Sequence, residues 1–139
     1  MKVIHESEVF ENIVPGRFLR WIVDAKDGLE AQFCSCCIMR VLPGQTVQPA
    51  HCHPRGEELI YFISGVGKVY VDGITKPVHE GSAVLFGPGE IHMVRNSGTE
   101  EMKVVCFFAP ASNLDEYEYH PEVDFDSGIE CKNLGVMQT

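Results

Sequence analysis

Two histidines, His51 and His53, lie two positions apart in the stretch HCHPRGEELIYFISG, which occupies residues 51 to 65. In a β-strand, residues i and i+2 point to the same face, so these two imidazoles would stand side by side, as a chelated metal ion requires. Two glutamates, Glu57 and Glu58, follow the turn at residues 54–56 and open an apolar run. The pattern fits either a metal site on a strand or an edge strand with solvated histidines.

A further histidine, His92, follows a Gly-Pro-Gly turn at residues 87–89, just as a Pro-Gly turn at 43–44 precedes His51. Two turns therefore each deliver a strand that carries histidine. For a shared site, the run that begins at Glu57 must pair back beside the first histidine strand. His92 must then come from a strand far along the chain.

The elements that would position these residues are strands. Short runs rich in Val, Ile, Phe, Tyr and Cys are separated by Gly, Pro or Asp-Gly, which predicts an all-β sandwich or barrel. Asp72-Gly73 predicts a tight turn between two antiparallel strands, because both positions tolerate positive φ. Little helix is expected: single turns in SEVFENI (residues 7–13) and in ASNLDEYEYH (residues 111–120).

The size and charge of the chain exclude several classes of protein. At 139 residues it has the length of one domain and can bury a core without disulfides. Its formal charge of −9 argues against a nucleic-acid partner. No apolar stretch reaches the roughly 20 residues of a membrane span, and the first residues lack the apolar core of a secretion signal. We therefore expect a cytoplasmic protein without a membrane partner, with its six cysteines reduced.

Two motifs, in this order, resemble those of the cupin superfamily. The first family motif, G-x5-H-x-H-x3,4-E-x6-G, is matched by Gly44, His51, His53, Glu58 and Gly65. The second, G-x5-P-x-G-x2-H-x3-N, is matched by Gly81, Gly89, His92 and Asn96. The departures are one extra residue before His51 and a proline, Pro88, that stands one position late. Two motifs at compatible separation, over roughly residues 40 to 110, are far more specific than either alone.

The resemblance implies a double-stranded β-helix, a jelly-roll cupin barrel of two antiparallel sheets, as a single domain over residues 1–139. Its barrel core would span about residues 30–110, after N-terminal strands within 1–29 and before a draped or partly disordered acidic arm at 111–139. The resemblance also implies a homodimer, and an interior metal ion held by His51, His53, Glu58 and His92. Glu57 fits the looser spacing of the motif, but only Glu58 has six residues before Gly65.

Three neutral imidazoles and one carboxylate suit one divalent transition metal, Fe, Mn, Ni, Co or Zn, rather than soft Cu(I). Four protein ligands would leave two positions of an octahedral ion open for water, dioxygen or a chelating substrate. The alternative is a barrel that has lost its metal and keeps these histidines as polar groups of a pocket. Asn96 is expected to secure the strand end after His92 by a bond to the backbone, not to contact a ligand.

Strand parity predicts the wall of a substrate pocket. If Glu58 points inward, so do Ile60 and Phe62, and Val94 follows His92. In the run at residues 33–42, the apolar face that should point into the barrel comprises Phe33, Cys37, Met39 and Val41. The opposite face, which would suit a dimer interface, comprises Cys34, Cys36, Ile38 and Arg40. Of these positions, Ile60, Phe62, Val94 and Met39 are predicted to contact the substrate.

Other polar residues receive weaker roles. Arg55, in the loop between ligands, is the arginine expected at the pocket mouth, since Arg40 and Arg95 share the outward parity. The three histidines outside both motifs are expected on the surface: His5, His79 and His120. Cys34, Cys36 and Cys37 lack a second cysteine pair at zinc-ribbon spacing, so they are expected to be free thiols, mostly buried.

Three functions fit these residues. The first is a mononuclear metal-dependent dioxygenase acting on a small oxygen-bearing molecule, in which Glu58 is catalytic by detaching or by accepting a proton. The second is a non-redox isomerase or lyase that uses the metal as a Lewis acid. The third is a non-catalytic small-molecule binding protein. One barrel fold hosts many chemistries, so the sequence leaves the substrate open.

Overall fold

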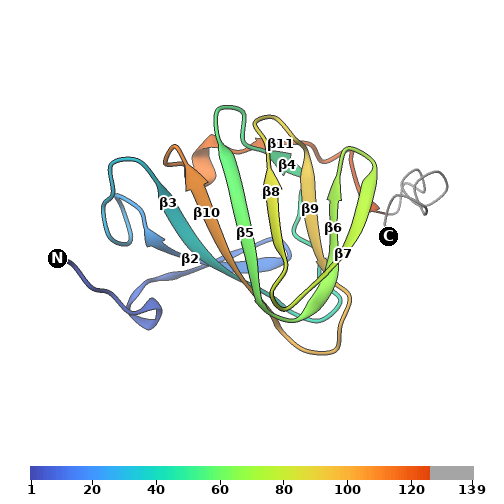
Figure 1. Cartoon of the computed structure of the whole chain (residues 1–139), viewed down its shortest axis with the longest axis horizontal. Helices are drawn as coiled ribbons and strands as arrows, with labels where there is room; N and C mark the ends of the chain where they lie inside the picture. The colour runs from blue at the N-terminus through green and yellow to red at the C-terminus, as the bar shows by residue number, and fades with distance from the viewer. Residues whose placement is uncertain (126–139) are drawn as a thin grey trace.

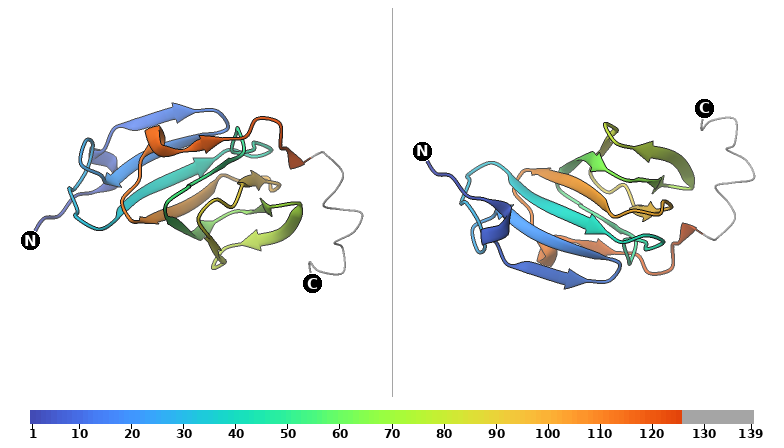
Figure 2. Two further views of the ribbon diagram at one scale, coloured as in Figure 1. Left: turned by 90° about the horizontal axis from the view of Figure 1, so that it is seen from above. Right: turned by 90° about the horizontal axis from the view of Figure 1, so that it is seen from below.

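The chain folds into two antiparallel sheets that face each other, as Figures 1 and 2 show for this computed structural model, which describes residues 1–125. One sheet has the strand order β1-β2-β3-β10-β5-β8, and the other has the order β11-β4-β9-β6-β7. This architecture confirms the predicted all-β jelly roll. None of the helical segments in this part of the chain is long and apolar enough to cross a membrane. The elements are η1 (Glu6–Glu8), β1 (Glu11–Val14), β2 (Arg17–Val23), β3 (Ser35–Val41), β4 (His51–Cys52), β5 (Glu57–Ser64), β6 (Val66–Val71), β7 (Ile74–His79), β8 (Ala83–Phe86), β9 (His92–Asn96), β10 (Met102–Ala109), η2 (Leu114–Glu116) and β11 (Glu118–Tyr119).

Alternation along β5 separates the core from the outer surface. Glu58, Ile60 and Phe62 point between the two sheets and are buried, as parity predicts. Leu59 and Tyr61 point outward, and their residues are 43% and 49% exposed. Side chains from both sheets form the apolar core between them, and this packing holds the two sheets of the jelly roll together.

The Asp72-Gly73 turn is the hairpin turn that the sequence predicts. Both residues have positive φ, +46° at Asp72 and +84° at Gly73, and Val71 pairs with Ile74 across them. Because β6 also pairs with β9, with Val71 opposite His92, the register set by this turn extends to one of the candidate metal ligands.

The strand β3 corrects the prediction for its two faces. Phe33 precedes the strand and is exposed, so it does not point into the barrel. Cys36 and Ile38 do lie on the outer face, yet both are buried. The N-terminal turn lies over this part of the sheet: Arg20 donates to the Glu6 carbonyl at 2.7 Å, and the Lys103 ammonium reaches the Glu6 carboxylate at 2.7 Å. This outer face is therefore covered by the chain itself.

The acidic segment at residues 111–125, which we call the strap, is folded against the barrel. Ser35 Oγ donates to the Ser112 carbonyl at 2.7 Å, and Leu114 and Tyr117 pack against the core. The strand β11 then pairs with β4, with Tyr119 opposite His51. The draped arm predicted from the sequence thus lies on the barrel as far as residue 125, and its part at 126–139 lies outside the described residues.

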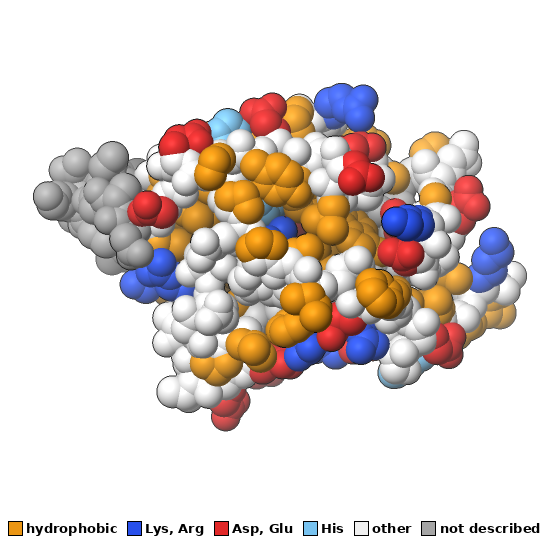
Figure 3. Space-filling model, turned by 180° about the vertical axis from the view of Figure 1, so that it is seen from behind, with side chains coloured by type: hydrophobic (Ala, Val, Ile, Leu, Met, Phe, Trp, Pro, Cys, Tyr) orange, Lys and Arg blue, Asp and Glu red, His pale blue; other side chains and the backbone are white. Residues whose placement is uncertain are grey.

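Apolar side chains are exposed on more than one side of the molecule. Phe107, Leu59 and Leu85 stand in register across β10, β5 and β8 and are 40%, 43% and 59% exposed. On the face turned away from the viewer in Figure 1, hydrophobic side chains also gather near the middle (Figure 3). Such surface is compatible with the homodimer expected from the sequence, which stays a prediction.

The fully buried amide of Asn96 holds the end of β9, as the sequence predicts. Its Nδ2 donates to the carbonyls of Val41 at 2.8 Å and Glu100 at 2.7 Å, and its Oδ1 accepts from the Gly98 amide at 2.9 Å. Replacing Asn96 would leave three buried or half-buried backbone groups without their hydrogen-bond partners, and each would then carry a desolvation penalty.

We expect Asn96→Ala to lower the free energy of unfolding by about 3 kcal/mol in urea denaturation, because these backbone groups lose their partners. The matched control is Thr75→Val, since the buried Thr75 hydroxyl has no hydrogen-bond partner among the described residues. This control should unfold at the same or a higher urea concentration. Equal stability of Asn96→Ala and wild type would contradict the structural role of the amide.

Candidate metal centre

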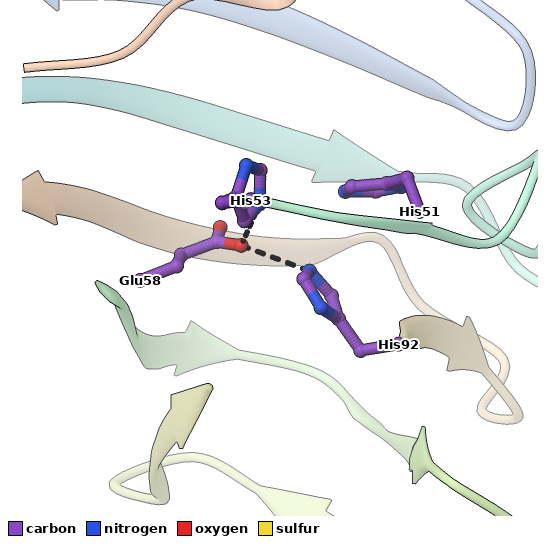
Figure 4. A group of neighbouring side chains, drawn as sticks. All are labelled: His51, His53, Glu58 and His92. Carbon is purple, nitrogen blue, oxygen red and sulfur yellow. Dashed lines mark hydrogen bonds and ion pairs between the residues drawn. The ribbon is translucent and has the colours of Figure 1, made fainter. Parts of the chain in front are cut away.

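Four buried side chains converge inside the barrel: His51 on β4, His53 just after it, Glu58 on β5 and His92 at the start of β9 (Figure 4). Their ligand atoms all lie within 4.8 Å of one another. The Glu58 Oε1 atom is 2.9 Å from His53 Nε2 and 3.0 Å from His92 Nε2. The structure therefore brings together all four residues that the two motifs single out, and it places Glu57 on the exposed side of β5.

Backbone carbonyls orient two of the imidazoles. His51 Nδ1 is 3.1 Å from the Pro49 carbonyl, and His92 Nδ1 is 2.9 Å from the Glu90 carbonyl. A carbonyl oxygen only accepts, so each Nδ1 carries the proton and each Nε2 presents a lone pair. Neutral imidazoles held in this way are the usual form of a metal-binding histidine.

The contact between His92 and Glu58 fits a cation between them. With its Nδ1 proton directed at the Glu90 carbonyl, His92 would direct a lone pair from Nε2 at the carboxylate, which repels it. Either a second ring proton or a metal ion must therefore occupy the space between Nε2 and Oε1. The Nδ1 atom of His53 adds to this, because it is buried and has no hydrogen-bond partner in the described chain. The four residues thus fit a bound divalent metal.

Burial and neighbouring charges set the protonation of the site. Burial lowers the pKa of His51 well below its ordinary value, and the nearby Arg17 guanidinium lowers it further. Burial would raise the pKa of Glu58, but the contacts of its carboxylate with the Nε2 atoms of His53 and His92 outweigh burial and hold that pKa below the usual range. The imidazole of His51 is therefore neutral and the carboxylate of Glu58 is ionised.

The space beside the ligands is a cavity of about 20 Å³, enough for about one water molecule. Met39, Ile60 and Val94 line it, as the sequence predicts, whereas Phe62 lies in the core away from it. Arg55 is elsewhere: it pairs with Glu116 at 3.4 Å and lines an outer hollow. The predicted substrate contacts of these five residues stay predictions.

The sequence reasoning missed several residues of the cavity wall, among them two with hydrogen-bonding side chains. Arg17 begins β2 and is only 5% exposed. Arg17 alternates in step with the apolar Leu19 and Trp21 in RFLRWIV, and this pattern could have indicated its inward position. Tyr117, in the strap, stacks on the His51 ring with centroids 4.7 Å apart. No pattern in its acidic surroundings indicated that its side chain packs against the core.

Tyr117 keeps its proton in this environment. Burial raises the pKa of Tyr117 well above its ordinary value, and the negative charge of Glu58 raises it further. The phenol is therefore a hydrogen-bond donor beside the ligands. On the other side of the site, the Phe86 ring stacks on His92 at 3.8 Å, which fixes that imidazole.

The remaining cysteines and histidines lie mostly where the sequence places them. Cys36, Cys37, Cys52 and Cys106 are buried free thiols, and Cys34 is half-buried. Burial raises the pKa of Cys36 to about 12. His5 and His79 are exposed. His120 is instead half-buried, and its ring nitrogens lie 2.9 Å from Glu118 and 3.1 Å from Glu122.

We expect Glu58→Gln to weaken the binding of a divalent metal by about 100-fold or more in calorimetric titration of chelator-treated protein, because the centre loses its single anionic ligand. The matched control is Glu57→Gln, the neighbouring carboxylate on the exposed face, which should bind metal as the wild type does. A Glu58→Gln variant with wild-type affinity would exclude this carboxylate from the site.

Comparison with known proteins agrees with this architecture. Residues 37–108 match the sequence model of the Cupin domain. A polyketide synthase, CurC of Streptomyces cyaneus, is 30% identical over 110 residues, which cover 78% of this chain and 70% of that protein. The polyketide cyclase RemF of Streptomyces resistomycificus is 24% identical, with a TM-score of 0.67 over 78% of this chain and 79% of that one. A conserved double-stranded β-helix protein of Klebsiella pneumoniae is 22% identical, with a TM-score of 0.68 over 86% and 96% of the two chains. The chain belongs to the cupin domain family.

Proposed function

We propose that this chain is a metal-dependent enzyme that acts on a small oxygen-bearing organic molecule by non-redox chemistry, such as ring closure of a polycarbonyl chain. The observation that carries the proposal is the convergence of four buried metal-ligating side chains, His51, His53, Glu58 and His92, beside a cavity. Likeness to a named polyketide synthase and to a polyketide cyclase supports a polycarbonyl substrate.

A divalent ion bound by these four residues would supply Lewis-acid chemistry, which polarises a carbonyl oxygen and acidifies the carbon beside it. Fe, Mn, Ni, Co and Zn all suit three imidazoles and one carboxylate. Glu58 contributes the one negative charge of the donor set, so the centre as a whole stays positive and favours an oxygen ligand that carries negative charge.

The residues around the ligands would hold the substrate and manage its proton. Tyr117, with its phenol protonated, is placed to donate from Oη to a substrate oxygen that gains negative charge. The apolar side chains of Ile60, Phe86 and Val94 exclude water from the opposite wall. Glu58 remains a further candidate for catalysis, because its carboxylate could detach from the metal or accept a proton.

The second candidate is the dioxygenase. Four protein ligands leave two positions of an octahedral ion open, and these could take dioxygen and a chelating substrate together. A small-molecule binding protein without turnover would use the same pocket. A cytoplasmic homodimer, formed from a single domain over residues 1–139, remains our expectation for the state in which any of these functions is carried out.

Turnover should require the metal and be independent of oxygen. We expect chelator-treated protein to be inactive on short linear poly-β-ketones, and one equivalent of a divalent metal to restore activity, because substrate activation depends on the Lewis acid. Product formation, followed by liquid chromatography, should be equal under argon and in air. Turnover of diketones, catechols or flavonols only in air would favour the dioxygenase, and none under either atmosphere would favour the binding protein.

The phenol of Tyr117 can be tested apart from the metal. We expect Tyr117→Phe to lower kcat about 100-fold, because the proton donor is lost, while the affinity for metal stays at the wild-type value. The matched control is Tyr61→Phe, on the outward face of β5, whose residue is 49% exposed and which should keep the wild-type kcat. Wild-type kcat in Tyr117→Phe would remove the phenol from the mechanism.

A further inference from the structure

Arg17 is a buried cation with no carboxylate in direct ion-pair contact among residues 1–125. Its residue is 5% exposed, and its Nη1 donates to the carbonyls of Pro15 at 3.0 Å and Gln48 at 2.7 Å. Across residues 1–125, no carboxylate oxygen lies within ion-pair distance of this guanidinium, and Nε and Nη2 donate no hydrogen bond. A buried charge without a partner is costly, so such a residue usually awaits one.

Three other arginines differ from Arg17 in this respect. Arg20 and Arg40 both pair with Glu11, at 3.3 Å and 2.8 Å, and Arg55 pairs with Glu116. Each of these three is more exposed than Arg17. They are paired with carboxylates, whereas Arg17 is held by backbone carbonyls, which fix its position without cancelling its charge.

The position of Arg17 joins the metal centre to the outside. It lines the inner cavity together with His51, Glu58 and His92. It also lines a surface groove of about 280 Å³ between the turn after β1 and the strap, whose other walls are Val14, Pro15, Gln48, Pro49, Leu114 and Tyr119. Arg17 therefore lies between the surface groove and the cavity beside the metal ligands.

Charge adds a requirement on the ligand. A divalent ion together with the Arg17 guanidinium would bring three positive charges into the interior, against the one negative charge of Glu58. A ligand with a carboxylate would compensate this excess, and the planar fork of a guanidinium matches a carboxylate with two parallel hydrogen bonds.

We propose that Arg17 binds a carboxylate of the substrate, so that the substrate class is an organic acid whose carbonyl oxygen faces the metal ligands. A β-keto acid is a simple molecule that carries both groups. The contact between the substrate carbonyl and the metal centre rests on the proposed function. The contact between the substrate carboxylate and Arg17 is argued from the position and hydrogen bonds of the guanidinium alone.

The test compares two ligands of equal size, the anion acetoacetate and the neutral amide acetoacetamide. Calorimetric titration of the zinc-loaded full chain should show tighter binding of acetoacetate. We expect Arg17→Gln to lower this preference at least about tenfold, which is the contribution of a hydrogen bond to a charged group. Arg17→Lys should retain an intermediate preference, because it keeps the charge but loses the fork. Arg20→Gln, on the outward face of the same strand, should keep the wild-type preference.

Zinc content and thermal unfolding of each variant separate this inference from the proposed function. A merely structural role of Arg17 would lower stability but leave the preference between the two ligands unchanged, and that result would overturn the proposal. Equal binding of both ligands by the wild type would also overturn it, even with zinc bound. A wild-type chain that binds no zinc would overturn the metal centre, while the same titrations on chelator-treated protein would still test Arg17.

Discussion

A carboxylate buried among three imidazoles is the constraint on which the interior of this protein depends. An isolated ionised carboxylate cannot be removed from water without a large penalty, so its neighbours must supply positive charge or hydrogen bonds. Here His53 and His92 approach the same oxygen of Glu58, within 3.0 Å. Because backbone carbonyls already take up the Nδ1 proton of His92, the arrangement is electrostatically complete when a cation lies at the centre.

The jelly-roll topology makes this cluster possible with few residues. His51 pairs directly with His92 across β4 and β9, although the two lie far apart in sequence. Glu58 comes from the facing sheet, in which β5 lies between β10 and β8. The ligands are thus held by two sheets packed through one apolar core, and side-chain direction is set by strand parity. A rigid scaffold of this kind preserves ligand geometry better than a flexible loop would.

Strand parity and the two motifs predicted the barrel and the ligand cluster because both depend on local rules. The period of two in EELIYFIS fixed which side chains of β5 face the core, and the Asp72-Gly73 turn fixed a register.

The local rules failed where contacts between distant parts of the chain determine the structure. Phe33 lies before β3 and not in it. The turn at Glu6 covers the outer face of β3, whose apolar residues had suggested a dimer interface. Tyr117 is half-buried by the folding of a polar segment over the barrel, for which no local pattern exists. Arg17 was missed, although its parity with Leu19 and Trp21 indicated an inward position.

The pairing of β11 with β4 links two processes that are usually considered separately. The strand that carries His51 is held on one side by β9 and on the other by the strap, with Tyr119 opposite His51. The inner cavity has room for about one water molecule, so an organic molecule fits beside the ligands only when part of the cavity wall, to which Tyr117 of the strap belongs, moves outward. An outward movement of the strap would loosen the strand that carries His51. The rate at which a bound ion exchanges with solvent would then be coupled to the rate at which the strap moves, and a molecule that kept the strap in place would slow the loss of the metal.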